Sequence, residues 1–128
     1  MFTIEQIKTA HSKVRSGADF PAFIAEIQKM GVVRYTTFVS DGHTDYYGTH
    51  HMASSAPTYA SMTIAKECNA VQFQKDLLAH QQGKTDYLTF CAQCAQLGIE
   101  KWKVSMEKMS CTYYDKKGME ILKEIIPG

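Results

Sequence analysis

Hydrophobic and polar positions in the first thirty residues follow the spacing of two amphipathic helices. Thr3-Ile4-Glu5-Gln6 matches a capping box, in which the threonine and glutamine side chains each bond a backbone amide at the start of a helix. We expect this first helix to end at Gly17. We expect Asp19 to cap a second helix that stops at Gly31, because glycine tolerates the left-handed backbone that ends many helices. The apolar stripe of the second helix contains Phe20, Phe23, Ile24, Ile27 and Met30.

The pattern changes to simple alternation after the second helix, which predicts a hairpin of strands. Residues 32–39 form the first expected strand, and Asp41-Gly42 is typical of a tight turn. We expect residues 44–51 to form the returning strand, with Val39 opposite Thr44. Residues 52–58 read as a loop, and residues 59–64 form a weaker third strand.

The second half of the chain predicts a helix pair followed by an antiparallel meander. Asn69 caps a helix that stops at Gly83, and Thr85 caps the next helix, which runs to Gly98. Alternating segments then cover residues 101–106, 109–114 and 119–126. The sequence thus predicts a single α+β domain over residues 1–128, with two N-terminal helices, a mainly antiparallel sheet of about five or six strands and a central helix pair packed on one face.

Composition narrows the classes of function and location. The chain has 128 residues, 45% of them hydrophobic, which suits one domain with one core. Fourteen Lys and Arg against 13 Asp and Glu leave a net charge of +1, which argues against a dedicated binder of duplex nucleic acid. The N-terminus resembles neither a signal peptide nor a membrane span, and the four cysteines suit a reducing, cytoplasmic location. These features are compatible with a homodimer.

The pentapeptide Gly-x-Thr-Asp-Tyr occurs twice, at residues 42–46 and 83–87. The flanking residues of the two copies do not match, so coincidence is favoured over duplication. Glycine, threonine and aspartate are recruited routinely to turns and helix caps. We therefore interpret the first copy as part of a hairpin turn and the second as a helix stop followed by a helix start.

Polar side chains gather on one face of the expected hairpin, because residues two apart in a strand point the same way. Within this set, a His-Asp pair two residues apart could orient an imidazole as a general base, and an arginine could hold an anion. The alternative is a solvated outer face of an antiparallel sheet. The candidate ligand-binding residues are Arg34, His43, Asp45, Tyr47 and His51.

Two other sets of residues suggest chemistry. A hydrolase or lyase would use His43 or His80 as its base and Asp45 or Asp86 to orient it. Cys91 and Cys94 could supply two zinc ligands, but they lie inside a predicted helix, where core packing is favoured over metal binding or redox catalysis. Tyr113-Tyr114 with nearby lysines could stack single-stranded bases, although interspersed acids dilute the charge. The pattern indicates no cofactor.

The chain also resembles a known family. Residues 41–46, 80–87, 98–102 and 111–115 together are similar to the YbcV-like family, a group of small enterobacterial and prophage-borne proteins with a domain of unknown function. The resemblance implies a bacterial intracellular protein and brings no catalytic residues. Our leading hypothesis is a non-catalytic protein that binds a small polar ligand or a protein partner on the polar hairpin face. A small hydrolase or lyase is the alternative, and a zinc module is less favoured.

Overall fold

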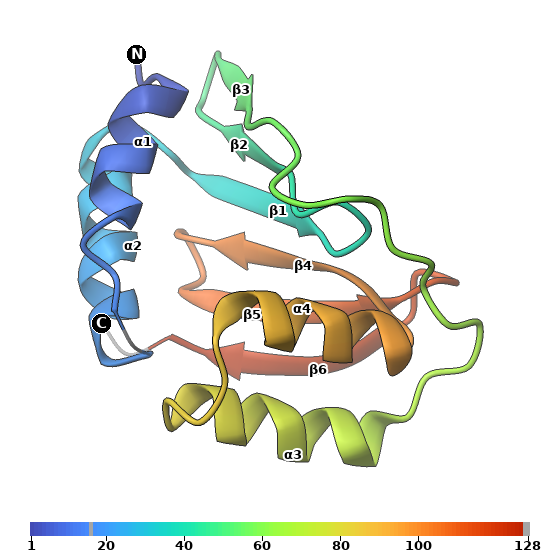
Figure 1. Ribbon diagram of the computed structural model, residues 1–128. Coiled ribbons are helices and arrows are strands. Elements are labelled where there is room, and N and C mark those ends of the chain that lie inside the picture. Colours follow the sequence, from blue (N-terminus) through green and yellow to red (C-terminus); the bar gives the residue numbers. More distant parts are fainter. Residues whose placement is uncertain (16, 127–128) are drawn as a thin grey trace.

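The computed structural model describes residues 1–15 and 17–126, which form an α+β domain around a six-stranded sheet (Figure 1). All neighbouring strands are antiparallel, and their order across the sheet is β3-β2-β1-β4-β5-β6. The predicted fold class is therefore confirmed. The strands are β1 (Arg34–Phe38), β2 (Thr44–Tyr47), β3 (Met52–Ser54), β4 (Ile99–Ser105), β5 (Ser110–Asp115) and β6 (Glu120–Ile125).

Two helices, α1 (Ile4–His11) and α2 (Phe20–Lys29), open the chain beside the ends of the strands (Figure 1). The capping box is confirmed, because the Gln6 amide donates to the Thr3 hydroxyl and the Thr3 amide donates to the Gln6 side chain. The predicted end of α1 at Gly17 is wrong. A short 3-10 turn (Gly17–Asp19) precedes α2 instead.

The helix α2 starts where the sequence predicts, but its start is not capped as predicted. The Asp19 carboxylate makes no capping bond to α2 and accepts from the Arg15 amide at 2.9 Å. Gly31, at φ +106°, is the expected left-handed residue after the helix. The His11 ring meets the Phe23 ring edge-on with centroids 5.2 Å apart, which helps to hold α1 against α2.

The hairpin of β1 and β2 differs from the prediction in register and length. Thr37, not Val39, lies opposite Thr44. The Phe38 amide donates to the His43 carbonyl at 3.0 Å and the Gly42 amide donates to the Phe38 carbonyl at 2.8 Å, which closes the turn over residues 38–43. The turn therefore contains more residues than Asp41-Gly42 alone. Because the shift is by two residues, each side chain keeps its predicted face.

The returning strand and the segment after it also differ from the prediction. Residues 44–51 do not form one strand, since β2 ends at Tyr47 and residues 52–54, predicted as loop, add β3 at the edge of the sheet. Residues 59–64 do not form the predicted third strand. The Tyr59 hydroxyl donates to the Val39 carbonyl at 2.6 Å, and the Met62 amide donates to the Ser40 carbonyl at 2.7 Å. These isolated bonds hold an irregular segment in place.

The helix pair α3 (Ala70–Gln81) and α4 (Tyr87–Gln96) covers one face of the sheet (Figure 1). Asn69 caps α3 as predicted, but Asp86 caps α4 in place of Thr85, accepting from the Thr89 amide at 2.7 Å. Phe73 of α3 meets Tyr113 of β5 with ring centroids 5.0 Å apart. The core therefore lies between the helix pair and this face of the sheet, and it extends to α1 and α2, whose buried residues Ile7 and Ile24 belong to the same cluster.

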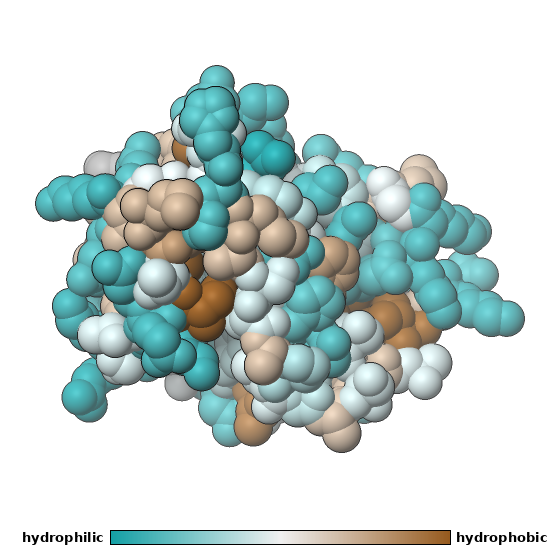
Figure 2. Space-filling view, turned by 90° about the horizontal axis from the view of Figure 1, so that it is seen from above, coloured by the Kyte–Doolittle hydropathy of each residue, from teal (hydrophilic) through white to brown (hydrophobic). Residues whose placement is uncertain are grey.

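The surface above the β3 edge of the sheet is mostly hydrophilic, with small separate hydrophobic areas (Figure 2). Met52 is an exposed apolar side chain on the three-residue edge strand β3. Such a short edge strand offers few unpaired backbone groups to another chain. Among the described residues, no helix has the length and apolar character needed to cross a membrane.

Candidate functional site

The face of the sheet opposite the helix pair carries most of the predicted site residues. Strand residues alternate between two faces, so the neighbours of the buried Tyr35, Trp102 and Tyr113 point away from the helices. We call this surface the open face. The cross-strand pairs place these residues on it: Arg34, Thr36, Phe38, Asp45, Tyr47, Lys101, Lys103, Thr112, Tyr114 and Lys123.

Arg34 and Tyr47 form a cation–π pair at one end of the open face. The two residues are opposite each other in β1 and β2, and the guanidinium carbon lies 4.5 Å from the centre of the tyrosine ring. Stacking leaves the edge of the guanidinium, which carries its N–H donors, available for hydrogen bonds. Arg34 is exposed, so an anion from solvent can reach these donors.

His43 lies at the other end of β2, between two carboxylates and against an aromatic ring. Its ring stacks on Phe38 with centroids 4.5 Å apart. The Nδ1 atom lies 2.5 Å from Asp41 Oδ1, and the Nε2 atom lies 3.9 Å from Asp45 Oδ1. The predicted neighbour Asp45 is thus near His43, but Asp41 makes the closer contact.

Sequence reasoning missed the role of Asp41 because it treated the residue only as part of the turn. The Asp41 carboxylate also accepts from the His43 backbone amide at 3.0 Å. Bonds from this amide and then from the ring lower the pKa of Asp41. An aspartate that accepts from the amide two residues later is a common turn motif, and this signal was present in the sequence.

Asp45 is held from its other side by the edge strand. The Ser54 hydroxyl donates to Asp45 Oδ1 at 2.6 Å, and Ser54 is the cross-strand neighbour of Asp45 in β3. The side chain of Asp45 is 17% exposed to solvent. Its carboxylate is therefore oriented by the protein and still reachable from solvent.

The His51 side chain contacts Phe2 and none of the other four candidates in the hydrogen bonds and ring contacts of the described residues. Its Nε2 atom lies 3.0 Å from the Phe2 carbonyl oxygen, and its ring meets the Phe2 ring edge-on. The alternation that put His51 on the polar face ends with β2 at Tyr47. Of the five predicted ligand-binding residues, Arg34, His43, Asp45 and Tyr47 share the open face.

His80 and Asp86 each engage a different partner. The His80 ring stacks on Phe90 with centroids 4.3 Å apart, and its Nδ1 atom lies 3.1 Å from both the carbonyl and the hydroxyl oxygen of Thr85. Burial lowers the pKa of His80. The Asp86 carboxylate caps α4. This geometry fits a structural histidine and a helix cap.

Cys91 and Cys94 point into the core from α4, and both are 0% exposed. All four cysteines are free thiols. Burial raises the pKa of Cys91 and Cys94, which disfavours the thiolate that metal binding and redox chemistry require. Within residues 1–15 and 17–126, the structure holds no group of three or more His, Cys, Asp or Glu that could bind a metal ion.

The aromatic and basic residues near Tyr113 divide between the two faces. Tyr113 and Trp102 are buried under the helix pair, with ring centroids 6.0 Å apart. Tyr114 lies on the open face, with Lys103 Nζ 5.1 Å and Lys101 Nζ 5.9 Å from its ring centre. The open face thus has a second cation–π cluster, on β4 and β5.

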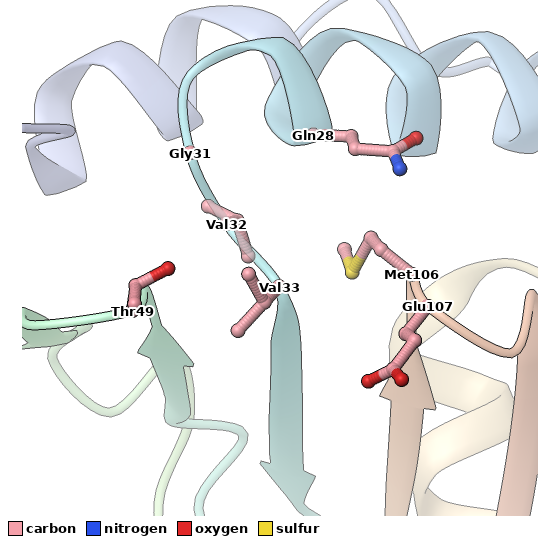
Figure 3. A pocket seen from close by; sticks show the side chains of 7 residues that line it. All are labelled: Gln28, Gly31, Val32, Val33, Thr49, Met106 and Glu107. Atoms are coloured by element: carbon pink, nitrogen blue, oxygen red, sulfur yellow. The ribbon is translucent and has the colours of Figure 1, made fainter.

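A shallow groove of about 340 Å³ lies at the opposite end of β1 from His43 (Figure 3). Gln28 of α2 reaches over one side of the groove, and Thr49 and Glu107 border it from the loops below. Its lining contains none of the predicted site residues: it consists of Gln28, Gly31, Val32, Val33, Thr49, Met106 and Glu107. The groove and the His43 cluster are therefore separate features.

Comparison with known proteins relates the chain to one family. No curated protein matches the sequence. A family model described as a protein of unknown function (DUF1398) matches residues 8–125, which is most of the chain. The chain therefore belongs to the DUF1398 family.

Proposed function

We propose that the protein is a non-catalytic binding protein whose open face holds a small polar ligand with an anionic group. The observation that carries the proposal is the Arg34–Tyr47 pair, in which the guanidinium lies 4.5 Å above the ring on an exposed face. A stacked arginine loses little further freedom when it binds an anion, because the ring already restricts its orientation.

Asp45 and His43 supply complementary polar groups along the same side of β2, two and four residues from Tyr47. Asp45 is fixed by Ser54 at 2.6 Å and can accept a bond from a ligand hydroxyl or amine through its second oxygen. The His43 ring and the Arg34 guanidinium, which stack on Phe38 and Tyr47, have planar outer faces that suit a planar part of the ligand. Because β1 pairs on both sides, the groups are held on a rigid scaffold.

A thermal-shift assay with three defined probes tests this proposal: inorganic phosphate, citrate and adenosine monophosphate. We expect at least one probe to raise the Tm of the wild-type protein, and Arg34→Ala to abolish the rise. His43→Ala and Asp45→Ala should reduce it. Lys29→Ala removes an exposed charge from α2 and should leave the rise unchanged. If no probe raises the Tm, or if Arg34→Ala keeps the full rise, the proposal is wrong.

A small hydrolase or lyase is the second candidate, favoured by the 2.5 Å contact between His43 Nδ1 and Asp41. In such an enzyme Asp41 would orient the ring and Nε2 would accept the substrate proton. It ranks second because Nε2 faces Asp45 and the Ser54 hydroxyl already donates to Asp45. Hydrolysis of p-nitrophenyl acetate above background that His43→Ala abolishes would favour it over simple binding.

We propose a cytoplasmic location for the protein, supported by its four free cysteines. The YbcV-like resemblance, with its bacterial and prophage-borne origin, and a homodimer are further parts of this proposal. Labelling with a thiol reagent after unfolding in cell extract would report whether the four thiols stay reduced. Size-exclusion chromatography with light scattering would report the oligomeric state.

A further inference from the structure

We propose that single-stranded nucleic acid is the ligand of the open face, with bases stacked on its aromatic rings and phosphates bound by its lysines and Arg34. This inference rests on the proposed function and names the class of ligand. It is carried by two cation–π clusters on one sheet face, Arg34 over Tyr47 and the lysines beside Tyr114.

The aromatic rings of the open face lie in two rows across the strands, with one row of residues between them. Phe38, Lys101 and Tyr114 are direct cross-strand neighbours in β1, β4 and β5. Tyr47 lies in β2, on the far side of β1 (Figure 1). Since neighbouring strands are about 4.8 Å apart, Phe38 and Tyr114 are separated by roughly 10 Å. The rings are therefore spaced to take different bases of one strand.

One row of residues separates the row of Phe38 and Tyr114 from the row of Tyr47. Thr36 and Thr112 are in this middle row, with Lys103 between them. Both threonines are buried, whereas Lys103 is exposed. A base can approach the rings on either side of this row, because every base has a flat face and stacking does not require a specific sequence.

The charged residues of the open face divide between its two sides. Asp41 and Asp45 lie beside His43, and Arg34 is the cation of β1. Lys101 and Lys103 of β4 lie beside the Tyr114 ring, and Glu120 is the carboxylate opposite Tyr114. The positive charge is therefore concentrated beside Tyr114, where a ring flanked by lysines is the combination that single strands require.

The same geometry disfavours duplex nucleic acid. In a duplex the bases are stacked on each other and their flat faces cannot reach Tyr47, Phe38 or Tyr114. The phosphate contacts available are few, so binding without stacking is weak. The open face should therefore prefer single strands over a duplex. Comparison of a DNA probe with an RNA probe distinguishes the two kinds of single strand.

Fluorescence anisotropy with labelled oligonucleotides of about twelve nucleotides tests the inference, because single-strand sites on one domain span this length. The probes are oligo-dT, oligo-rU and a duplex of the same length, each at about 50 mM salt. We expect at least one single strand to bind about tenfold or more tightly than the duplex. Similar binding of the duplex, or no binding of either single strand, would overturn the inference.

Variants in the cluster of Tyr114, Lys101 and Lys103 test the inference more directly than the wild-type protein alone. Tyr114→Ala should weaken single-strand binding about tenfold, while Tyr114→Phe, which keeps the ring, should bind like wild type. Lys103→Ala should weaken binding and make the slope of log affinity against log salt less steep by about 0.7. Lys29→Ala is the matched charge control, and circular dichroism verifies the fold. Wild-type affinity for Tyr114→Ala would also contradict the inference.

The outcome separates this inference from the proposed function. If phosphate, citrate or adenosine monophosphate raises the Tm through Arg34 but neither oligonucleotide binds, the nucleic-acid inference is wrong and the binding function stands. If neither small probes nor oligonucleotides bind, both are wrong. If a small probe raises the Tm through Arg34, and an oligonucleotide binds in a way that Tyr114→Ala weakens, both are supported.

Discussion

Tyr113 and Tyr114 are consecutive residues of β5 with opposite surroundings. Tyr113 is 7% exposed and packs against Phe73 and Trp102 beneath the helix pair. Tyr114 faces the other way, with two lysine ammonium groups near its ring. The covered face and the open face are thus built by alternate residues of the same strands.

The difference teaches where aromatic residues are needed for the fold and where they are free for binding. On the covered face, rings fill the space between sheet and helices, so their loss leaves a cavity. On the open face, Phe38, Tyr47 and Tyr114 pair with His43, Arg34 and the lysines. These pairs contribute little to stability at an exposed surface, which makes the open face the better candidate for function.

Alanine at the two tyrosines should give the largest contrast in stability. We expect Tyr113→Ala to lower the free energy of unfolding by about 3–5 kcal/mol, because it opens a cavity beside Phe73 and Trp102. Tyr114→Ala should cost about 1 kcal/mol or less, because no core packing is lost. Urea unfolding followed by circular dichroism measures both. Equal costs would contradict the division of the sheet into a covered and an open face.

Valine at two neighbouring threonines should give a smaller contrast of the same kind. Thr37 is buried on the covered face, where its hydroxyl lies 2.8 Å from the Thr44 hydroxyl. Thr37→Val should cost about 1–2 kcal/mol, because it removes this buried hydrogen bond. Thr36, one residue away on the open face, is also buried, but its hydroxyl makes no hydrogen bond within residues 1–15 and 17–126, so Thr36→Val should change the stability by about 0.5 kcal/mol or less. Thermal unfolding of the two variants side by side tests this, and a larger loss for Thr36→Val would reverse the assignment of faces.

The pH dependence of stability should separate His80 from Asp41. Burial lowers the pKa of His80 below its ordinary 6.5, so the unfolded chain takes up this proton first as the pH falls. His80 therefore lowers the free energy of unfolding progressively as the pH falls below about 6.5. His80→Gln should make the loss of stability between about pH 7 and pH 5 smaller. Urea unfolding at several pH values measures this slope, and an unchanged slope in the variant would contradict the assignment.

The pKa of Asp41 affects the stability of the fold at lower pH than the pKa of His80 does. Its bonds from His43 lower its pKa below 3.8, so they stabilise the folded protein above that pH and are lost as the pH falls through the lowered pKa. Asp41→Asn should therefore make the acid side of the stability profile flatter near pH 3–4. Because Asp41 is partly exposed, we expect this to be the smallest of the effects.

Local signals in the sequence predicted many of the elements correctly. The capping box at Thr3, the cap at Asn69 and the stops at Gly31 and Gly83 all occur in the structure. These features depend on bonds between residues a few positions apart, which the sequence contains directly. The cap of α4 was wrong by one residue, because Thr85 instead contacts His80 while Asp86 bonds the helix.

Contacts between distant segments were not predictable in this way. The Val39 amide donates to the Glu100 carbonyl, about sixty positions further along the chain, and this bond continues the pairing of β1 with β4. Residues 59–64 look like a strand but take no strand partner, while residues 52–54 take one. Residues 52–54 can pair because β2 leaves one edge of the sheet free, and this depends on the order of the strands in the complete fold.

The sequence by itself determined the α+β class, the order of elements and the separation of side chains into two faces, because helix and strand periods are properties of neighbouring residues. It thereby placed Arg34, His43, Asp45 and Tyr47 on one face. Only the tertiary structure decided that the helix pair covers the opposite face, that Asp41 contacts His43, that His51 bonds Phe2 and that Lys101 and Lys103 meet Tyr114. These outcomes depend on strand order and register, which long-range packing sets.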